Sequence, residues 1–391
     1  MSLKSLLYPA AAACLMLCMH YAVFKSLMLF FRISRPQVKI LLYAAMVVLS
    51  FSFITAFSLI HWKENFWTVN WYRFAGTWTA FVIHCLAAVA AAWIVIIAAR
   101  LAGVRLPSKA IGAAVVCVTL FLTAYGIWAS YHPVVRQVTA KVATLPENWE
   151  NSTIIHLSDI HLGHFYKSGF AGRITEAVNS LDPDLVLITG DILDGMGGPF
   201  SKNLEPLCGL SSKHGVFFVT GNHEHYVGIE KSLSILEKTP LRILNNEAVE
   251  INGLEIVGVS YPGIDDISQI KNFRPEKTPG TVRISMFHTP TEMGKDKKNM
   301  GQQHFANYWM PDTSYKMNIK TQADLQLSGH THHGQIFPVN LLTRLLYRGY
   351  DKGLKKINGT YLYVSAGTGS WGAPVRTTGR PEIAAIKLVR K

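Results

Sequence analysis

Cysteine is scarce in this chain of 391 residues, and it is unevenly distributed. Four of the five cysteines lie in apolar stretches before residue 130, and only Cys208 lies beyond it. One thiol cannot form an internal disulfide, and a structural zinc site needs a cluster of thiolates. The C-terminal part of the chain is therefore expected to use neither, and the cysteine count does not decide between cellular compartments.

Acidic residues are almost absent from the first 144 positions. Residues 1–144 hold 12 Lys and Arg against one acidic residue, Glu64, whereas residues 145–391 hold 26 against 24. The formal net charge of +13 therefore divides into +11 and +2. A basic excess beside apolar sequence is typical of membrane topology and anionic lipid headgroups, so no nucleic-acid partner is expected.

Five short motifs of metal-binding side chains follow one another in the C-terminal part. They are Asp159-Ile160-His161, Gly190-Asp191, Gly221-Asn222-His223-Glu224, His288 and Gly329-His330-Thr331-His332. Each follows a run that is typical of a buried strand, such as TIIHLS before the first motif and LVLITG before the second. In parallel α/β proteins, ligands bind beyond the carboxyl ends of the strands. The ordered motifs thus predict a single metal site, although one such motif alone would more often be a loop.

The types of donor indicate the chemistry of this site. Carboxylate, imidazole and amide donors suit divalent Mn, Fe, Zn, Co or Ni. Two ions about 3.5–4 Å apart with one shared carboxylate would use every donor, and they would lower the pKa of a bridging water from about 15.7 toward 7. The resulting hydroxide would attack a phosphoester. The candidate ligands are Asp159, His161, Asp191, Asn222, His288, His330 and His332.

With these motifs the chain resembles the calcineurin-like metallophosphoesterase superfamily, whose motifs run D-x-H, G-D, G-N-H-E, H and G-H-x-H. The resemblance covers residues 151–391. It implies an α/β domain that folds as a four-layer αββα sandwich. It also implies two divalent metal ions, most often Mn, with Asp191 bridging. The first ion would be held by Asp159, His161, Asp191 and His332, and the second by Asp191, Asn222, His288 and His330.

The same resemblance implies catalytic roles for Asp191 and His223. His223 corresponds to a histidine that is not a ligand, steadies the scissile phosphate and protonates the leaving oxygen. Asn222 and His223 would contact the substrate. The runs GHTHHGQ and SAGTG resemble the bacterial membrane-attached branch, in which position 333 is usually Gly. Here it is His333, for which a third-site donor, an outer-sphere partner and a surface substitution all stay open. Residues 293–321 form an insert relative to shorter family members.

Residues 1–130 predict an all-α transmembrane region of four helices. The length of each apolar run is close to the ~20 residues that a helix needs to cross a bilayer. Apolar residues in these runs show little helical periodicity, which favours helices surrounded by lipid. The first run lacks a convincing cleavage site and three more runs follow it, which argues against a signal peptide. A polar linker is expected at 131–150, before the domain at 151–391. The runs are about 6–24, 40–60, 78–99 and 110–130.

Basic residues in the short loops predict the orientation of these helices. Seven lie between the first and second runs or between the third and fourth, against five on the other side. Because loops rich in Lys and Arg stay in the cytoplasm, both chain ends and the C-terminal domain are predicted outside. Together with the bacterial resemblance this predicts a multi-pass protein of the inner membrane. The seven are Lys25, Arg32, Arg35, Lys39, Arg100, Arg105 and Lys109.

Two classes of function are consistent with the sequence. The first is a membrane-tethered phosphohydrolase or phosphodiesterase that acts on a phospholipid, a glycolipid, another envelope component or a phosphorylated small molecule. A basic and apolar stretch at 344–356 could rest on lipid or receive an anionic substrate. The second is a non-catalytic membrane receptor or assembly factor on a phosphoesterase scaffold. A nuclease is a weaker enzyme alternative, because the balance of +2 gives no basic surface. A protein phosphatase is weaker too, because the protein phosphatases of this superfamily are usually soluble and carry additional arginines near the motifs.

Overall fold

The computed structural model describes residues 3–291, 308–309, 311–357 and 359–391. It divides the chain into two compact units. The helical unit comprises Met1–Ala129, Ile336–Val339 and Gly372–Thr377, and the sheet unit comprises Ser130–Gln335, Asn340–Trp371 and Thr378–Lys391. Two short segments from the C-terminal half therefore group with the N-terminal helices.

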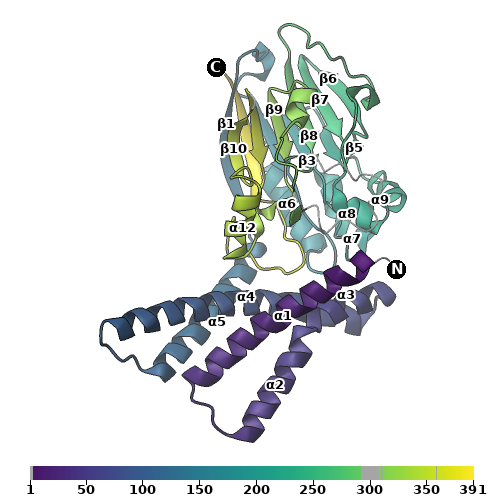
Figure 1. The fold of residues 1–391 in the computed structure, drawn as a ribbon. Helices are drawn as coiled ribbons and strands as arrows, with labels where there is room; N and C mark the ends of the chain where they lie inside the picture. Colours follow the sequence, from purple (N-terminus) through teal and green to yellow (C-terminus); the bar gives the residue numbers. More distant parts are fainter. Residues whose placement is uncertain (1–2, 292–307, 310, 358) are drawn as a thin grey trace. The chain divides into compact units, whose positions relative to one another are not determined.

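The helical unit is built from five α-helices (Figure 1). Three of them are long and apolar enough to cross a membrane, namely the spans Ala10–Phe30, Phe66–Leu101 and Ser108–Ser130. α2 and α3 pass the same test only together, with a bend of 43° between them. The predicted run 40–60 is thus a broken pair of helices and not one straight span. The helices are α1 (Leu3–Phe30), α2 (Pro36–Ser50), α3 (Ser52–Trp62), α4 (Phe66–Leu101) and α5 (Ser108–Ser130).

The sheet unit contains two sheets of six strands each. The first has the order β1-β12-β2-β3-β4-β5, in which β2, β3, β4 and β5 run parallel. Its strands are β1 (Val134–Val142), β12 (Glu382–Arg390), β2 (Thr153–Leu157), β3 (Leu185–Thr189), β4 (Val216–Val219) and β5 (Arg242–Ile243).

The second sheet has the order β10-β11-β9-β8-β7-β6, in which β7, β8, β9 and β11 run parallel. Its strands are β10 (Gly353–Ile357), β11 (Thr360–Val364), β9 (Leu325–Ser328), β8 (Val282–Phe287), β7 (Leu254–Val259) and β6 (Glu247–Ile251). Among the described residues, the α-helices that accompany these sheets are α6 (Ser168–Asn179), α7 (Phe200–Leu204), α8 (Asn222–Val227), α9 (Ile229–Leu236), α11 (Met317–Lys320) and α12 (Val339–Leu346).

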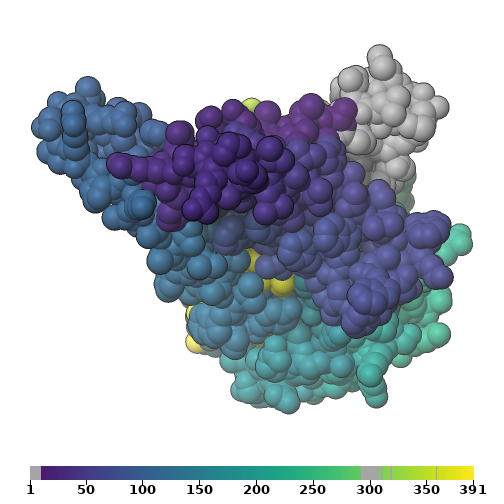
Figure 2. Space-filling model, turned by 90° about the horizontal axis from the view of Figure 1, so that it is seen from below, coloured from purple at the N-terminus to yellow at the C-terminus, as the bar shows by residue number. Residues whose placement is uncertain are grey.

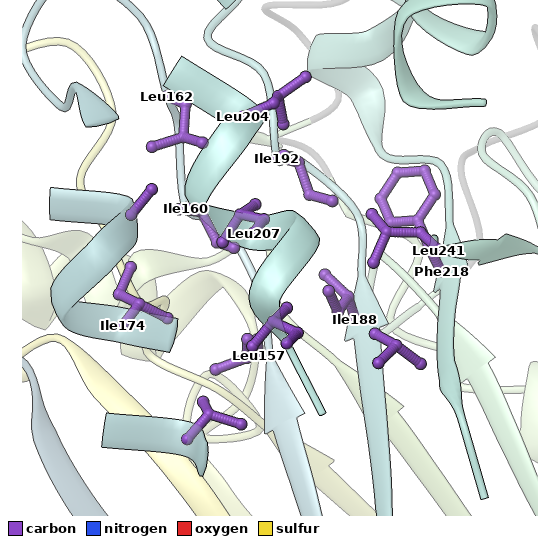
Figure 3. Packing of buried hydrophobic residues seen from close by; sticks show 14 of the residues in the cluster. Leu157, Ile160, Leu162, Ile174, Ile188, Ile192, Leu204, Leu207, Phe218 and Leu241 are labelled. Atoms are coloured by element: carbon purple, nitrogen blue, oxygen red, sulfur yellow. The ribbon is translucent and has the colours of Figure 1, made fainter. Parts of the chain in front are cut away.

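Alternate residues of the central strands face two different cores. On β3, Ile188 packs with Ile174 of α6 and Phe218 in the cluster that Figure 3 shows. Its neighbour Leu187 points the other way and packs with Ile284 of β8, between the two sheets. Side chains alternate across a strand, so a strand buried on both faces reads as one continuous apolar run. The predicted α/β sandwich of two stacked sheets is confirmed.

The expected linker at 131–150 is wrong for nine of its twenty residues, which form a strand. β1 occupies Val134–Val142 and pairs in parallel with β12 along all nine residues. Its odd-numbered positions face solvent and include Gln137, Thr139 and Lys141, while Ala140 and Val142 are buried. A strand at the edge of a sheet that exposes one face to solvent has polar residues at about every second position. Its amino-acid composition therefore resembles that of a polar linker.

Candidate metal centre

The predicted donors lie just beyond the carboxyl ends of five strands. Asp159 and His161 follow β2, Asp191 follows β3 and Asn222 follows β4 in the first sheet. In the second sheet His288 follows β8, and the Gly-His-x-His motif follows β9. The five strands predicted before the motifs are all present, so the two sheets bring the side chains together at one edge of the sandwich.

One group of donors forms around Asp159. The Nε2 atoms of His161 and His332 lie 3.0 Å apart. Asp159 Oδ1 lies 3.3 Å from Nε2 of His332 and 3.8 Å from Nε2 of His161. All three residues are buried. They meet the geometric requirement for holding one ion between them.

A second group forms beside it, and Asp191 joins the two. Asp191 Oδ2 lies 3.2 Å from His288 Nε2 in the second group and 3.9 Å from His161 Nε2 in the first. Asn222 Oδ1 lies 2.9 Å from both His288 Nε2 and His330 Nδ1. The structure thus brings all seven predicted donors together, with Asp191 at the join.

These distances suit divalent metal ions. Two donors that bind one tetrahedral ion at about 2.1 Å lie about 3.4 Å from each other. The observed separations of 2.9–3.9 Å bracket that value. The converging atoms are imidazole nitrogens, carboxylate oxygens and one amide oxygen, which are the donor types that such ions bind. The donor set therefore fits the metal pair that the motifs imply.

The backbone at these positions is strained. Five donors adopt the left-handed conformation, which is uncommon for residues other than glycine and costs of order 1–3 kcal/mol each. Hydrogen bonds hold it in place: Asp159 N–H donates to Gly190 O at 3.0 Å, and His161 N–H donates to Asp191 O at 3.0 Å. Strain of this kind clusters at functional sites. The φ angles are 54° at Asp159, 54° at His161, 55° at Asp191, 70° at His330 and 48° at His332.

The glycines of two motifs are needed for space. A Cβ at Gly221 would clash with the carboxylate of Asp191, and one at Gly329 would clash with Ser158 and Asp159. Each glycine therefore allows a neighbouring strand end to approach a candidate ligand closely. This explains why the motifs carry Gly before Asn222 and before His330.

Carboxylates and imidazoles within the centre shift one another's pKa values. Burial alone would raise the pKa of Asp191, but the imidazoles of His288 and His223 outweigh it and hold that pKa below its usual range. Burial likewise opposes protonation of His288, yet Asp191 raises its pKa to about 9. Burial and the neighbouring His288 lower the pKa of His330 to about 3. The protein groups alone therefore keep anionic carboxylates at the centre, where cations would bind.

Glu224 was not assigned a role from the sequence, although it ends the third motif. It is fully buried and its carboxylate accepts three backbone N–H groups. Oε2 accepts from Gly221 at 2.7 Å and from Asp191 at 2.9 Å, and Oε1 accepts from Leu193 at 3.1 Å. Burial and the nearby Asp191 charge raise the pKa of Glu224 to about 7. Glu224 thus ties the loop after β3 to the loop after β4.

His223 is held on two sides beside the donors. Its backbone N–H donates to Asp191 Oδ1 at 2.8 Å, and its Nδ1 accepts from the backbone N–H of Gly195 at 2.9 Å. Because Nδ1 accepts, a neutral ring carries its proton on Nε2. Asp194 Oδ1 lies 3.7 Å from Nδ1, so Asp194 is a neighbour of the centre and not a remote loop residue. His161, Asp194 and His223 form a third grouping with metal-binding geometry.

Two further side chains border the centre. His333 Nδ1 donates to Asp351 Oδ2 at 2.6 Å, and Asp351 is buried. His333 is thus held by a buried carboxylate at the position directly after His332. Most of the predicted insert at 293–321 lies outside the described residues. Within the described part, Tyr308 donates its hydroxyl to Thr331 O at 2.6 Å, and its ring centroid lies 5.5 Å from that of His330.

The family and the relatives that this chain matches are all described as phosphoesterases or metallophosphoesterases. Residues 152–334 match the family described as calcineurin-like phosphoesterase. The chain is 38% identical over 239 residues to an uncharacterized metallophosphoesterase of Helicobacter pylori, a match that covers 61% of this chain and 60% of that relative. It is 31% identical over 280 residues to an uncharacterized metallophosphoesterase of Campylobacter jejuni, covering 70% of this chain and 69% of the relative. A transmembrane protein with metallophosphoesterase domain from Danio rerio is 32% identical over 279 residues, a match that covers 69% of this chain and 61% of that relative.

Proposed function

This chain belongs to the calcineurin-like phosphoesterase family of metal-dependent phosphoric ester hydrolases, and on that premise we propose that it is a membrane-tethered enzyme acting on a lipid-linked phosphoester. The observation that carries the proposal is the convergence of seven donors on Asp191 in a chain that also has long apolar helices. The chain spans about 60% of the Helicobacter pylori relative, so its substrate is argued from its own residues.

The proposed ligand sets follow the two groups of donors. Asp159, His161, Asp191 and His332 would hold one ion, and Asp191, Asn222, His288 and His330 would hold the other, with Mn²⁺ as the first choice and Fe, Zn, Co or Ni as alternatives. When bound, the two ions generate a nucleophile from water near neutral pH and neutralise charge on the phosphoryl group. The bridging position of Asp191 is supported by Oδ2, which lies within 4 Å of an imidazole from each group.

In the proposed mechanism His223 acts on the substrate and not on the metal. Its contacts to Asp191 and Gly195 fix both its backbone and its ring. Nε2–H is then the free end of the neutral ring, able to donate to a phosphoryl oxygen and to pass a proton to the leaving oxygen. Asn222 would share the substrate site, since its neighbour in sequence is His223 and its Oδ1 sits among the second set of donors.

A surface close in sequence to the last motif supports a lipid substrate. α12 begins at Val339, shortly after His332, and exposes Leu341, Leu342 and Leu345 with 58%, 46% and 73% of their surface accessible. Arg344 and Arg348 are exposed on the same stretch. Leucines beside basic residues on one short helix are typical of a helix that rests in the lipid headgroup region. Tethering also raises the effective concentration of a bilayer substrate.

The proposed location is the bacterial inner membrane with the sheet unit outside the cytoplasm. Support comes from the seven-to-five distribution of basic loop residues and from the long apolar helices. The proposed partners are the bilayer and a phosphorylated lipid or small molecule, with no nucleic acid.

The experiment that tests the proposal is a substrate panel on the full-length protein in detergent with Mn²⁺. Soluble phosphomonoesters and phosphodiesters are compared with phospholipids and phosphoglycolipids in mixed micelles. We expect turnover of at least one lipid at a higher kcat/KM than any soluble ester. Efficient cleavage of soluble diesters with every lipid ignored would reject the lipid substrate. Bound metal without any turnover would instead favour the receptor or assembly-factor class.

A further inference from the structure

Three arginines from separate segments line one cavity of the helical unit. The cavity has a volume of about 680 Å³ and lies between the end of α1, the end of α4 and the start of α5. Arg32 comes from the loop after α1, Arg100 from the last turn of α4 and Arg105 from the turn before α5. That turn projects at one end of the helical unit (Figure 1), and Figure 2 views the same unit from below.

Nothing in the helical unit neutralises these charges. Glu64 is the single acidic residue of positions 1–144, and the segments 336–339 and 372–377 contain none. Among the described residues, none of the three guanidinium groups has a carboxylate within 4 Å, and Arg32 Nε donates only to the hydroxyl of Ser108 at 3.1 Å. Three like charges around one cavity repel each other, so an anion bound there would be stabilised.

Apart from Ser108, the rest of the cavity wall is apolar, and part of it is well packed. Phe30 and Ile96 are 2% and 9% exposed, and the ring of Trp93 lies 5.3 Å from that of Phe30. Trp93 Nε1 donates to Ser26 Oγ at 3.0 Å, which fixes the indole. All three residues line the cavity together with the arginines. A ligand that fits has an anionic head and an apolar tail.

We propose that this cavity is a binding site for an anionic phospholipid. The headgroup phosphate lies among Arg32, Arg100 and Arg105, and an acyl chain follows Phe30 and Ile96. A volume of about 680 Å³ falls within the range of ~300–1,000 Å³ that is typical of ligand pockets. Basic pockets between membrane helices recognise lipid headgroups in this way. A choline headgroup binds less well, because its ammonium faces three guanidinium groups. The site is separate from the proposed catalysis and does not depend on it.

The test measures lipid binding to the full-length protein in a mild detergent. Native mass spectrometry counts retained lipids when phosphatidylglycerol, phosphatidylcholine or sn-glycerol 3-phosphate is added at equal concentration. We expect phosphatidylglycerol to bind roughly tenfold better than either of the others, a difference of about 1.4 kcal/mol. Equal binding of phosphatidylcholine, or tight binding of glycerol phosphate alone, overturns the proposal.

Matched variants separate this cavity from general surface charge. The triple variant R32A/R100A/R105A should lose the preference for phosphatidylglycerol. The control R35A/K39A/K109A removes the same charge at exposed positions in or beside the loops α1–α2 and α4–α5, outside the cavity lining, and it should keep the preference. Equal loss in both variants rejects a defined site.

If the triple variant does not purify as a folded protein, Ile96→Trp provides the second approach. It fills the acyl side of the cavity and leaves every arginine in place. We expect it to weaken phosphatidylglycerol binding severalfold. Its elution volume in size-exclusion chromatography should equal that of the wild type. Unaltered lipid binding in this variant contradicts the proposal.

Discussion

Glu224 binds the backbone of Asp191, the residue at which the two groups of metal donors meet. Its Oε2 accepts the N–H of Asp191 at 2.9 Å, and Asp191 in turn accepts the N–H of His223 at 2.8 Å. A buried carboxylate that is not a candidate ligand thus fixes a candidate ligand, which in turn fixes the proposed proton donor. The order of this chain of contacts determines what each substitution should do.

Glu224→Gln should weaken metal binding and stability together. The amide nitrogen of glutamine cannot accept a backbone N–H, so at least one of the three hydrogen bonds is lost in a buried place, at about 1–3 kcal/mol. We expect a lower Tm and a reduced metal content by elemental analysis. Glu250→Gln, on an exposed position of β6, is the control and should change neither. Wild-type metal content in Glu224→Gln would show that Asp191 does not need this support.

Asp191→Asn and His223→Ala should separate metal binding from proton transfer. Asparagine at 191 removes the charge that both donor groups share, so metal content and turnover should fall together. Alanine at 223 removes a side chain whose Nδ1 contacts only protein groups, so turnover should fall by about 10²–10⁴-fold while metal content stays near wild type.

The control for these two variants is His132→Ala, which removes an exposed imidazole. Its turnover and metal content should match those of the wild type. If His223→Ala loses metal as fully as Asp191→Asn, then His223 belongs to the ligand set, in the grouping with His161 and Asp194.

Metal removal should destabilise the sheet unit. Buried donors that converge at 2.9–3.9 Å lose their counter-charge when the ions leave. Ligand binding to the folded state stabilises it by about 2.7 kcal/mol at a hundredfold excess over Kd. We expect dialysis against EDTA to lower the Tm, and added Mn²⁺ to restore it more fully than Ca²⁺, which prefers oxygen ligands. Identical melting curves with and without EDTA would contradict a bound metal pair.

The exposed leucines of α12 should matter for lipid substrates alone. Leu345→Glu places a charge on a side chain that is 73% exposed, so folding should be unaffected, but insertion among lipid headgroups becomes unfavourable. We expect turnover of a micellar lipid to fall severalfold while turnover of a soluble ester is unchanged. Ile319→Glu on α11, where the side chain is 52% exposed, is the control. Equal loss on both substrates would indicate a folding defect.

The strands that carry the donors could be predicted from the sequence, because those strands are buried on both faces. Leu187 and Ile188 face different cores, so their segment reads as one apolar run that ends at Asp191. The convergence of the donors then follows from the parallel order of the strands. The candidate ligands themselves could be identified from the residue types and the spacing of the motifs alone.

Other features depend on contacts that no local pattern records. Glu224 acts through backbone N–H groups of Asp191 and Leu193, which come from a different strand end. The break between α2 and α3 at Phe51 falls inside an apolar run with no proline or glycine to mark it. β1 was mistaken for a linker because its outward residues, such as Lys141, are polar. For Glu224 and β1 a partner distant in sequence determines the structure.

The edge strand β1 yields the last prediction. Arg136 Nε donates to Glu382 Oε2 at 2.6 Å, and Glu382 is fully buried where it also accepts the hydroxyl of Tyr363 at 2.7 Å. Arg136→Ala leaves this buried carboxylate with one fewer donor, so we expect a loss of about 1–3 kcal/mol and a lower Tm for the full-length protein. Lys141→Ala removes an exposed basic residue from the same strand and should leave the Tm unchanged. Equal Tm values for the two variants would mean that residues 134–142 are not held in the sheet, and the linker interpretation would then be restored.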